Sequence, residues 1–177
     1  MKKVFIGIDF SKLKFDAAIY SVETKAIVAT EVFDNEQSGY VDFLQWVKAT
    51  TRFQKSGMLF CGEHTGYYSG NLSVFLYESG YDMWLVSGLE IKLTQGIKRT
   101  KTDRVDACKI AEHAYRYQDK VVLFQPVSKS LDEIRELLSY RERLVETRKV
   151  LTTSAKEMKH VKDNASCDYI YRDSIEY

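Results

Sequence analysis

The sequence of 177 residues contains few of the residues that cross-link or break a chain. It has one proline, Pro126, and three cysteines that lie far apart without a CxxC pair: Cys61, Cys108 and Cys167. This spacing favours neither a disulfide framework nor a zinc site. Isolated cysteines are typical of proteins in a reducing compartment, so we expect a cytoplasmic protein.

A long apolar run is also lacking. No stretch approaches membrane-spanning length, and the apolar run after Lys2 and Lys3 is interrupted at Asp9, too early for the central part of a signal peptide. With 45% hydrophobic and 13% aromatic residues, however, the chain has enough apolar side chains to bury a core. We therefore expect a folded domain with no membrane partner.

Net charge is low, but the charges are unevenly distributed. The formal net charge is +1, whereas residues 92–109 carry six basic and two acidic side chains, and residues 129–162 carry nine basic and six acidic ones. Basic segments beside acidic ones are typical of an enzyme that holds phosphates with one surface and cuts with another. They are equally common on solvated helix faces, so charge alone does not decide the function.

Three strands are predicted at the start of the chain, over residues 4–10, 14–20 and 26–33. The first strand alternates between two faces, one formed by Val4, Ile6 and Ile8 and the other by Phe5, Gly7 and Asp9. The turn-like segment SVETK separates the second strand from the third. We expect an antiparallel meander.

Helices and strands alternate after the meander. The patterns predict helices over residues 37–52, 66–80, 88–97 and 103–117, and strands over residues 58–63 and 81–87. The predicted fold class is α/β, with a mixed sheet flanked by helices. This order is that of the ribonuclease H-like proteins and also that of the actin-type ATPases.

A second element begins after Pro126. From Ser130 a long helix is predicted, with apolar residues every seven positions: Leu137, Leu144, Leu151 and Met158. This seven-residue series favours a coiled coil. Arg141 and Arg148, which would occupy other core positions of that coiled coil, also allow the helix to pack back on the first domain or to contact nucleic acid. We divide the chain into a domain over residues 1–125, a long helix or coiled coil over 128–162, and a tail over 163–177.

Two carboxylates are predicted to follow apolar strands. Asp9 lies in the first strand, and Glu63 ends the strand MLFCGE. Because ligands gather at the carboxyl ends of adjacent strands, these acids would form an oxygen-rich site suited to Mg²⁺ or Mn²⁺. The alternative interpretations are a turn-capping role for Asp9 and a solvated loop position for Glu63.

A third acidic group lies in KRTKTDRVDACKIAEHA, residues 98–114. Asp103 and Asp106 are three residues apart at a helix start, which places both on one face. They also match a helix-capping pair, which explains them without chemistry. Two further acids, Asp9 and Glu63, favour a metal site, and the basic run KRTK just before Asp103 favours a phosphate-binding surface beside it. The candidate nucleic-acid contacts are Lys12, Lys98, Arg99, Lys101 and Arg104.

Three motifs together resemble those of the DEDD-type insertion-sequence transposases, which include the bridge-RNA-guided recombinases and the Piv-type DNA invertases. The motifs are IGIDFSK at 6–12, GEHTGYYS at 62–69 and the string at 98–114. The resemblance covers residues 1–125 and implies a RuvC-like domain in which Asp9, Glu63, Asp103 and Asp106 bind divalent metal. It also implies transposition or recombination of DNA and a structured guide RNA. Two Mg²⁺ or Mn²⁺ ions would serve this chemistry, and the apolar series of the long helix leads us to expect a homo-oligomer formed through that helix.

The family resemblance also implies a C-terminal domain with a nucleophilic serine, which we expect this chain to lack as a truncated member. Ser166 and Ser174 do not match the context of that serine. We accordingly expect the isolated chain to have weak activity or none.

Two other functions remain open from the sequence. The first is the initial lobe of an actin-like sugar or acetate kinase, because IGIDFSK also resembles a phosphate-binding hairpin, but the pair Asp103 and Asp106 has no role there. The second is a module that binds nucleic acid and dimerises through residues 130–160 without turnover. Metal-dependent nicking of DNA separates that module from the nuclease.

Overall fold

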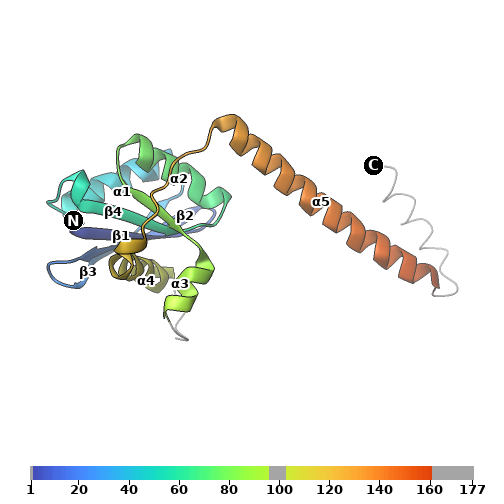
Figure 1. Ribbon diagram of the computed structural model, residues 1–177, viewed down its shortest axis with the longest axis horizontal. Helices are drawn as coiled ribbons and strands as arrows, with labels where there is room; N and C mark the ends of the chain where they lie inside the picture. The colour runs from blue at the N-terminus through green and yellow to red at the C-terminus, as the bar shows by residue number, and fades with distance from the viewer. Residues whose placement is uncertain (1, 96–102, 161–177) are drawn as a thin grey trace. The chain divides into compact units, whose positions relative to one another are not determined.

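A computed structural model describes residues 2–95 and 103–160 of the chain. The chain divides into two compact units, Met1–Pro126 and Val127–Tyr177. The first unit contains a five-stranded sheet with helices on both faces, and the second contains one long helix (Figure 1). Within the described residues, no helix is both long and apolar enough to span a membrane.

The sheet is mixed. Strands β1 (Val4–Phe10), β2 (Lys14–Ser21) and β3 (Ala26–Asp34) form the predicted antiparallel meander. Strand β4 (Met58–Glu63) pairs in parallel with β1, and β5 (Met83–Val86) pairs in parallel with β4, giving the order β3-β2-β1-β4-β5. The predicted fold class, a mixed ribonuclease H-like sheet flanked by helices, is confirmed.

Helices α1 (Gln37–Thr50) and α2 (Tyr67–Glu78) cover one face of the sheet. Helices α3 (Gly88–Gln95) and α4 (Asp103–Arg116) lie on the other side (Figure 1). Two short 3-10 turns, η1 (Lys55–Gly57) and η2 (Gln118–Lys120), join these elements. Helices α1 and α2 each end two residues earlier than predicted: Thr51 after α1 is extended, and Gly80, with a positive φ of 75°, follows α2.

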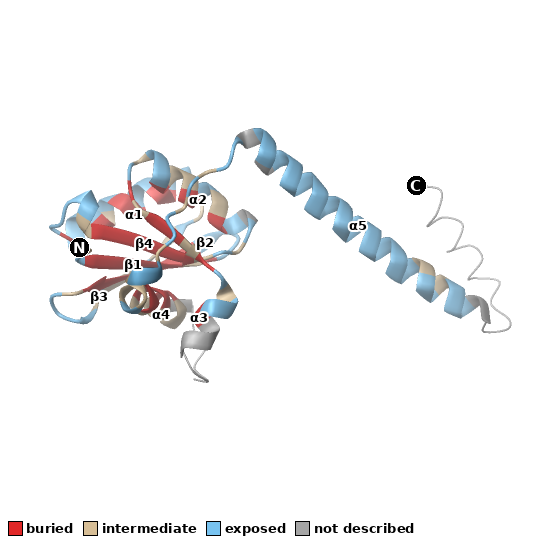
Figure 2. Cartoon of the chain, in the orientation of Figure 1, coloured by how far each residue is buried: buried red, intermediate tan, exposed pale blue. Residues whose placement is uncertain are grey.

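The strands of the sheet are largely buried (Figure 2). The alternation predicted for β1 is observed, and its two sets of side chains belong to two hydrophobic cores. Val4, Ile6 and Ile8 are buried against the side of α1 and α2, together with Phe43 of α1 and Leu72 of α2. Phe5 is buried on the opposite side with the small residues of α4, which are Ala107, Ala111 and Ala114. The face that carries Phe5, Gly7 and Asp9 is therefore the α4 face of the sheet.

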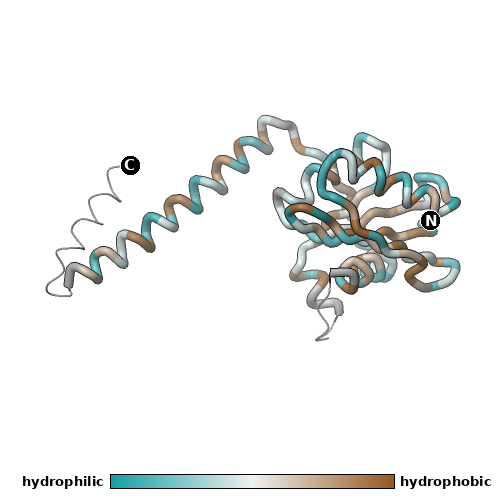
Figure 3. The backbone as a smooth tube through the Cα atoms, turned by 180° about the vertical axis from the view of Figure 1, so that it is seen from behind, coloured by the Kyte–Doolittle hydropathy of each residue, from teal (hydrophilic) through white to brown (hydrophobic). Residues whose placement is uncertain are grey.

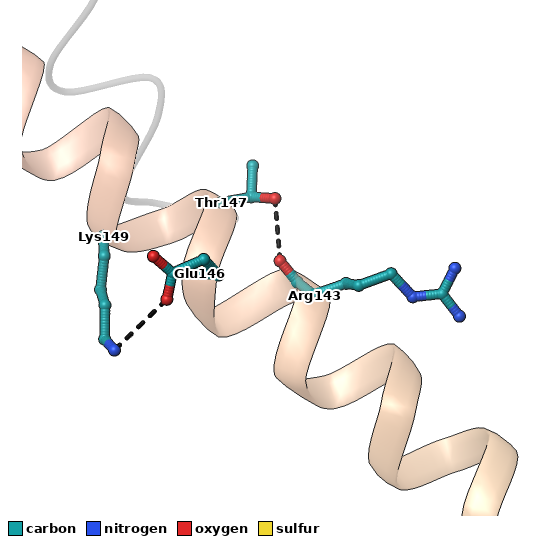
Figure 4. A network of polar contacts seen from close by, with 4 residues as sticks. All are labelled: Arg143, Glu146, Thr147 and Lys149. Carbon is teal, nitrogen blue, oxygen red and sulfur yellow. Dashed lines mark hydrogen bonds and ion pairs between the residues drawn. The ribbon is translucent and has the colours of Figure 1, made fainter. Parts of the chain in front are cut away.

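The described part of the second unit contains α5 (Lys129–His160). Apolar and polar residues alternate along it (Figure 3), and the predicted seven-residue series is exposed, with 68% for Leu137 and 53% for Leu144. Local bonds support the helix: the Thr147 hydroxyl donates to the Arg143 carbonyl at 2.8 Å, and Lys149 Nζ lies 3.4 Å from Glu146 Oε2 (Figure 4). The long helix is as predicted, and its coiled-coil pairing stays a prediction.

Candidate functional site

Asp9 and Glu63 lie side by side at the carboxyl ends of β1 and β4. The parallel pairing ends at Ile8 and Gly62, one residue before the two acids. Leu59 and Cys61 belong to the core of the α4 face, and the period of two places Glu63 on that face as well. Neighbouring strands lie about 4.8 Å apart, so both side chains project from the same face on adjacent strands.

The Glu63 carboxylate lies against the first residue of α3. A Cβ atom added to Gly88 would lie 1.9 Å from Glu63 Oε1 and 2.8 Å from its Cδ, so only glycine leaves space for this carboxylate. The backbone N–H groups at a helix start carry partial positive charge, which favours a carboxylate there. The backbone N–H of His64 also donates to the Val86 carbonyl at 2.8 Å, which continues the β4–β5 pairing past Glu63.

Close packing brings α4 to the same place. A Cβ atom at Gly7 would lie 2.2 Å from the Ala107 carbonyl oxygen and 2.3 Å from the Ala111 nitrogen, so the α4 backbone lies directly on β1. Asp106 immediately precedes Ala107 in α4, and Gly7, which Ala107 contacts, lies two residues before Asp9 in β1. Asp106 is half-buried, and its Oδ1 lies 2.5 Å from Nζ of Lys109 in the same helix.

A further acid, Asp16, lies beside this group and was missed in the sequence. Asp16 of β2 is directly opposite Asp9 in the antiparallel register and is only 6% exposed. Ala18 and Tyr20 of the same strand belong to the core of the α4 face, so Asp16 is on that face too. The alternation in KFDAAIY and the short turn between the first two strands were the signals that could have revealed it.

The remaining predicted residues are only partly described. Asp103 begins α4 and Arg104 follows it, but the positions of their side chains are outside the described part of the structure, as are Lys98, Arg99 and Lys101 altogether. Lys12 is exposed in the turn between β1 and β2. Among the side chains that are described, no three His, Cys, Asp or Glu residues are grouped closely enough to hold a metal ion.

The residue types at this site have the chemistry that a divalent cation needs. Carboxylate oxygens from two strand ends and a helix are the donors that Mg²⁺ and Mn²⁺ prefer. Two features fit a bound cation. Gly88 leaves room for the Glu63 carboxylate, and the Thr65 hydroxyl is buried without a hydrogen-bond partner in the described residues. Asp9, Glu63, Asp103 and Asp106 therefore remain the candidate ligand set.

Cys61 and His113, two described residues of this face with reactive side chains, belong to its core. Cys61 is fully buried, and burial raises the pKa of its thiol far above the ordinary value, so the thiol stays protonated. His113 of α4 packs between the rings of Trp84 and Tyr117, and burial lowers its pKa. Both belong to the core rather than to a nucleophilic site.

Comparison with known sequences gives one family. Residues 6–158 match the sequence model of the DEDD transposases of the IS110 type, described as transposase. The pilin gene-inverting proteins of Moraxella lacunata and Moraxella bovis are each 31% identical to the chain over 145 residues, which is 80% of this chain and 43% of each relative. The chain thus spans less than half the length of these relatives.

Among solved structures, the chain is similar to RuvC of Thermus thermophilus. One such structure covers 68% of this chain and 98% of its own, with a TM-score of 0.47 and 15% identity. The structure of T. thermophilus RuvC in complex with a Holliday junction substrate covers 69% of this chain and 99% of its own, with a TM-score of 0.47 and 13% identity.

Proposed function

The chain belongs to the DEDD transposases of the IS110 type, and on that premise we propose that its first unit is the acidic, metal-dependent domain for DNA strand cleavage and exchange during movement of a mobile element. The observation that supports this proposal is the parallel register of β1 and β4, which ends at Ile8 and Gly62, one residue before Asp9 and Glu63. The direct packing of α4 on Gly7 brings a third carboxylate, Asp106, to the same end of the sheet.

In this proposal Asp9, Glu63, Asp103 and Asp106 would hold two Mg²⁺ or Mn²⁺ ions. Such ions, when bound, supply stabilisation of the attacking and leaving oxygens of a phosphodiester. The chain's own residues supply the negative charge that holds them, and the start of α3 holds the Glu63 carboxylate in place. Lys109, which now pairs with Asp106, offers a charge that balances this carboxylate when no cation is bound.

DNA is the proposed substrate, and a structured guide RNA is a further proposed partner. Lys12, Lys98, Arg99, Lys101 and Arg104 are the proposed phosphate contacts. If they bind phosphates, affinity falls steeply with salt, and each contact adds about one to the slope of log affinity against log salt. Replacing Lys98, Arg99 and Lys101 together by alanine should weaken binding and reduce the slope; an unchanged slope rules out that surface.

The long helix is the proposed oligomerisation element. Its exposed series Leu137, Leu144, Leu151 and Met158 is an apolar stripe of the kind that pairs with a second helix. Sedimentation of the full chain and of a chain ending at Val127 tests this. The same monomeric mass for both, after allowing for the removed residues, would exclude self-pairing.

The metal site is tested by thermal unfolding. Millimolar Mg²⁺ or Mn²⁺ should raise the melting temperature of the chain, because a cation relieves the repulsion between the carboxylates and binds only the folded state. Asp9→Asn should abolish this response and, without metal, be neutral or stabilising. If the acids of α4 only cap their helix, Asp106→Ala costs about 1 kcal/mol with or without metal. That result, together with no response to metal, would refute the site.

A second candidate function is a module that binds nucleic acid and oligomerises without turnover. It is favoured by the absence of a three-ligand metal group among the described side chains and by the exposed stripe of α5. Nicking of supercoiled DNA by the chain, measured with and without Mn²⁺, distinguishes the two functions. Nicking that requires Mn²⁺ and is lost in Asp9→Asn excludes the module.

A further inference from the structure

Asn35 joins three segments that are distant in the sequence. It follows β3 and precedes α1, and its Nδ2 donates to the Ser11 carbonyl at 2.9 Å and to the Tyr68 carbonyl at 3.0 Å. Its Oδ1 accepts a hydrogen bond from the Tyr40 hydroxyl at 2.8 Å. Its backbone N–H also donates to the Leu13 carbonyl at 2.9 Å. One side chain thus links the β1–β2 turn, the first turn of α2, and α1.

An asparagine is specifically suited to this position. The carbonyls of Ser11 and Tyr68 only accept hydrogen bonds, so the group between them must supply two N–H donors. The hydroxyl of Tyr40, a residue that is 3% exposed, needs an acceptor, which the amide oxygen provides. Aspartate has the same shape but has no donor for the two carbonyls. The amide therefore fixes the distance between the turn and the start of α2.

The turn held in this way, Ser11–Leu13, begins two residues after Asp9. It is closed by hydrogen bonds from the Ser11 N–H and hydroxyl to the Lys14 carbonyl, at 2.9 Å and 2.7 Å. Lys12 is exposed in it, and Leu13 is 77% exposed. The turn with Lys12 lies at the same end of the sheet as Asp9 and Glu63, because β1 and β4 both end there.

We propose that Asn35 is a positioning residue for DNA: by tying the Ser11 carbonyl to the Tyr68 carbonyl, it holds the β1–β2 turn so that Lys12 meets a phosphate beside the acidic site. This inference rests on the proposed function, which includes the Lys12 contact. Asn35 acts on the turn and not on the acids, because Asp9 is held by its pairing with Asp16 of β2 and Glu63 by its pairing with Val86 of β5. A flexible lysine on a fixed turn loses less freedom on binding than one on a mobile turn.

A double-mutant cycle tests the proposal. The affinity of the full 177-residue chain for a labelled DNA duplex is measured over a series of salt concentrations for the unmodified chain, Lys12→Ala, Asn35→Ala and the double variant. Lys12→Ala should lower the slope of log affinity against log salt by about one. Asn35→Ala should lower the slope in the same direction, and the double variant should match Lys12→Ala alone, because the second change removes a contact already lost.

Two comparisons separate positioning from general damage. Tyr40→Phe removes one hydrogen bond to Asn35 but keeps both bridges, so its slope should equal that of the unmodified chain. The rise in melting temperature with Mn²⁺ should be the same in Asn35→Ala as in the unmodified chain. If Asn35→Ala does not fold, Asn35→Leu, which is similar in size and lacks both N–H donors, takes its place in the cycle.

The outcomes are distinct. An unmodified chain that does not bind the duplex, or a Lys12→Ala variant with an unchanged slope, refutes the proposed contact and the inference with it. If Lys12→Ala lowers the slope but Asn35→Ala does not, or if their losses add in full, only the positioning role is refuted. Loss of the Mn²⁺ response in Asn35→Ala would also refute it, since the residue would then act on the acids.

Discussion

The two faces of the sheet differ in how a helix packs against β1, although both faces contain aromatic rings. On the α1 and α2 face, large rings fill the space, with Phe43 centred 5.2 Å from Phe15 and 5.7 Å from Phe60, each in an edge-on arrangement. On the α4 face, Gly7 and Ala107 allow the helix backbone to lie directly on β1. Large rings stabilise by buried area, whereas small residues bring backbones together.

This difference explains where the acids lie. A helix held away from the sheet by phenylalanine rings could not place a short aspartate beside a strand carboxylate. The helix that lies on Gly7 can do so, and Asp106 is its residue at that edge. The α1 and α2 face, called the aromatic face below, should therefore determine stability. The α4 face, called the small-residue face because of Gly7 and Ala107, should determine the geometry of the site. Substitutions that change one property without the other test this division.

The largest expected loss of stability comes from the aromatic face. Phe43→Ala removes a fully buried ring and should lower the free energy of unfolding by about 3–5 kcal/mol. Where the variant remains folded, its melting temperature should still rise with Mn²⁺. Chemical denaturation measures the loss, and Val41→Ala on the exposed side of α1 is the control, expected within about 0.5 kcal/mol of the unmodified chain. A lost Mn²⁺ response in a folded Phe43→Ala chain would contradict the division.

Gly7→Ala should have a smaller effect on stability and a larger one on the site. The added Cβ meets backbone atoms of α4 that cannot move separately, so we expect a loss of about 1–3 kcal/mol and displacement of the helix. The displacement should abolish the Mn²⁺ response. Gly39→Ala is a matched control, because its Cβ would lie 2.1 Å from the Asp34 carbonyl oxygen, away from α4. Equal loss of the metal response in both variants would show that general destabilisation is the cause.

The sequence was sufficient to predict the face of β1 on which Asp9 lies and the family, but not the contacts between distant segments. The alternation of VFIGIDF assigned Phe5, Gly7 and Asp9 to one face, and the three motifs predicted the family. The position of Asp16 depends on the pairing of β2 with β1, and the bridge formed by Asn35 depends on segments 24 and 33 residues away. Local propensity contains no information on such contacts, because they arise only when the chain has folded.

Gly88→Ala should affect stability less than Gly7→Ala. Its added Cβ meets the end of the flexible Glu63 side chain rather than backbone, and the carboxylate can turn aside. We expect a change in the free energy of unfolding within about 0.5 kcal/mol. The displaced carboxylate should nevertheless weaken the Mn²⁺ response, measured as the metal concentration needed for half of the rise in melting temperature. An unchanged concentration would mean that Glu63 is not a ligand.

The smallest effect concerns His113, a titratable residue in the core of the α4 face. It is 3% exposed, and burial lowers its pKa below the ordinary value of 6.5, although the nearby Glu90 opposes this shift. The unfolded chain therefore takes up a proton at a higher pH than the folded chain does. The stability that comes from the neutral ring is fully present above about pH 6.5 and is lost as the pH falls from there toward the folded pKa.

Denaturation midpoints at about pH 7.5 and about pH 5.5 measure this loss, since few other side chains titrate in that interval. His113→Phe keeps an aromatic ring between Trp84 and Tyr117 and should reduce the difference between the two midpoints. His64→Gln is the control, because His64 is exposed, and it should leave the difference unchanged. If both variants retain the full difference, the acid sensitivity arises elsewhere, and the small-residue face tolerates a charged ring at its core. If only His113→Phe reduces it, the close packing that positions the acids also makes this face sensitive to protonation.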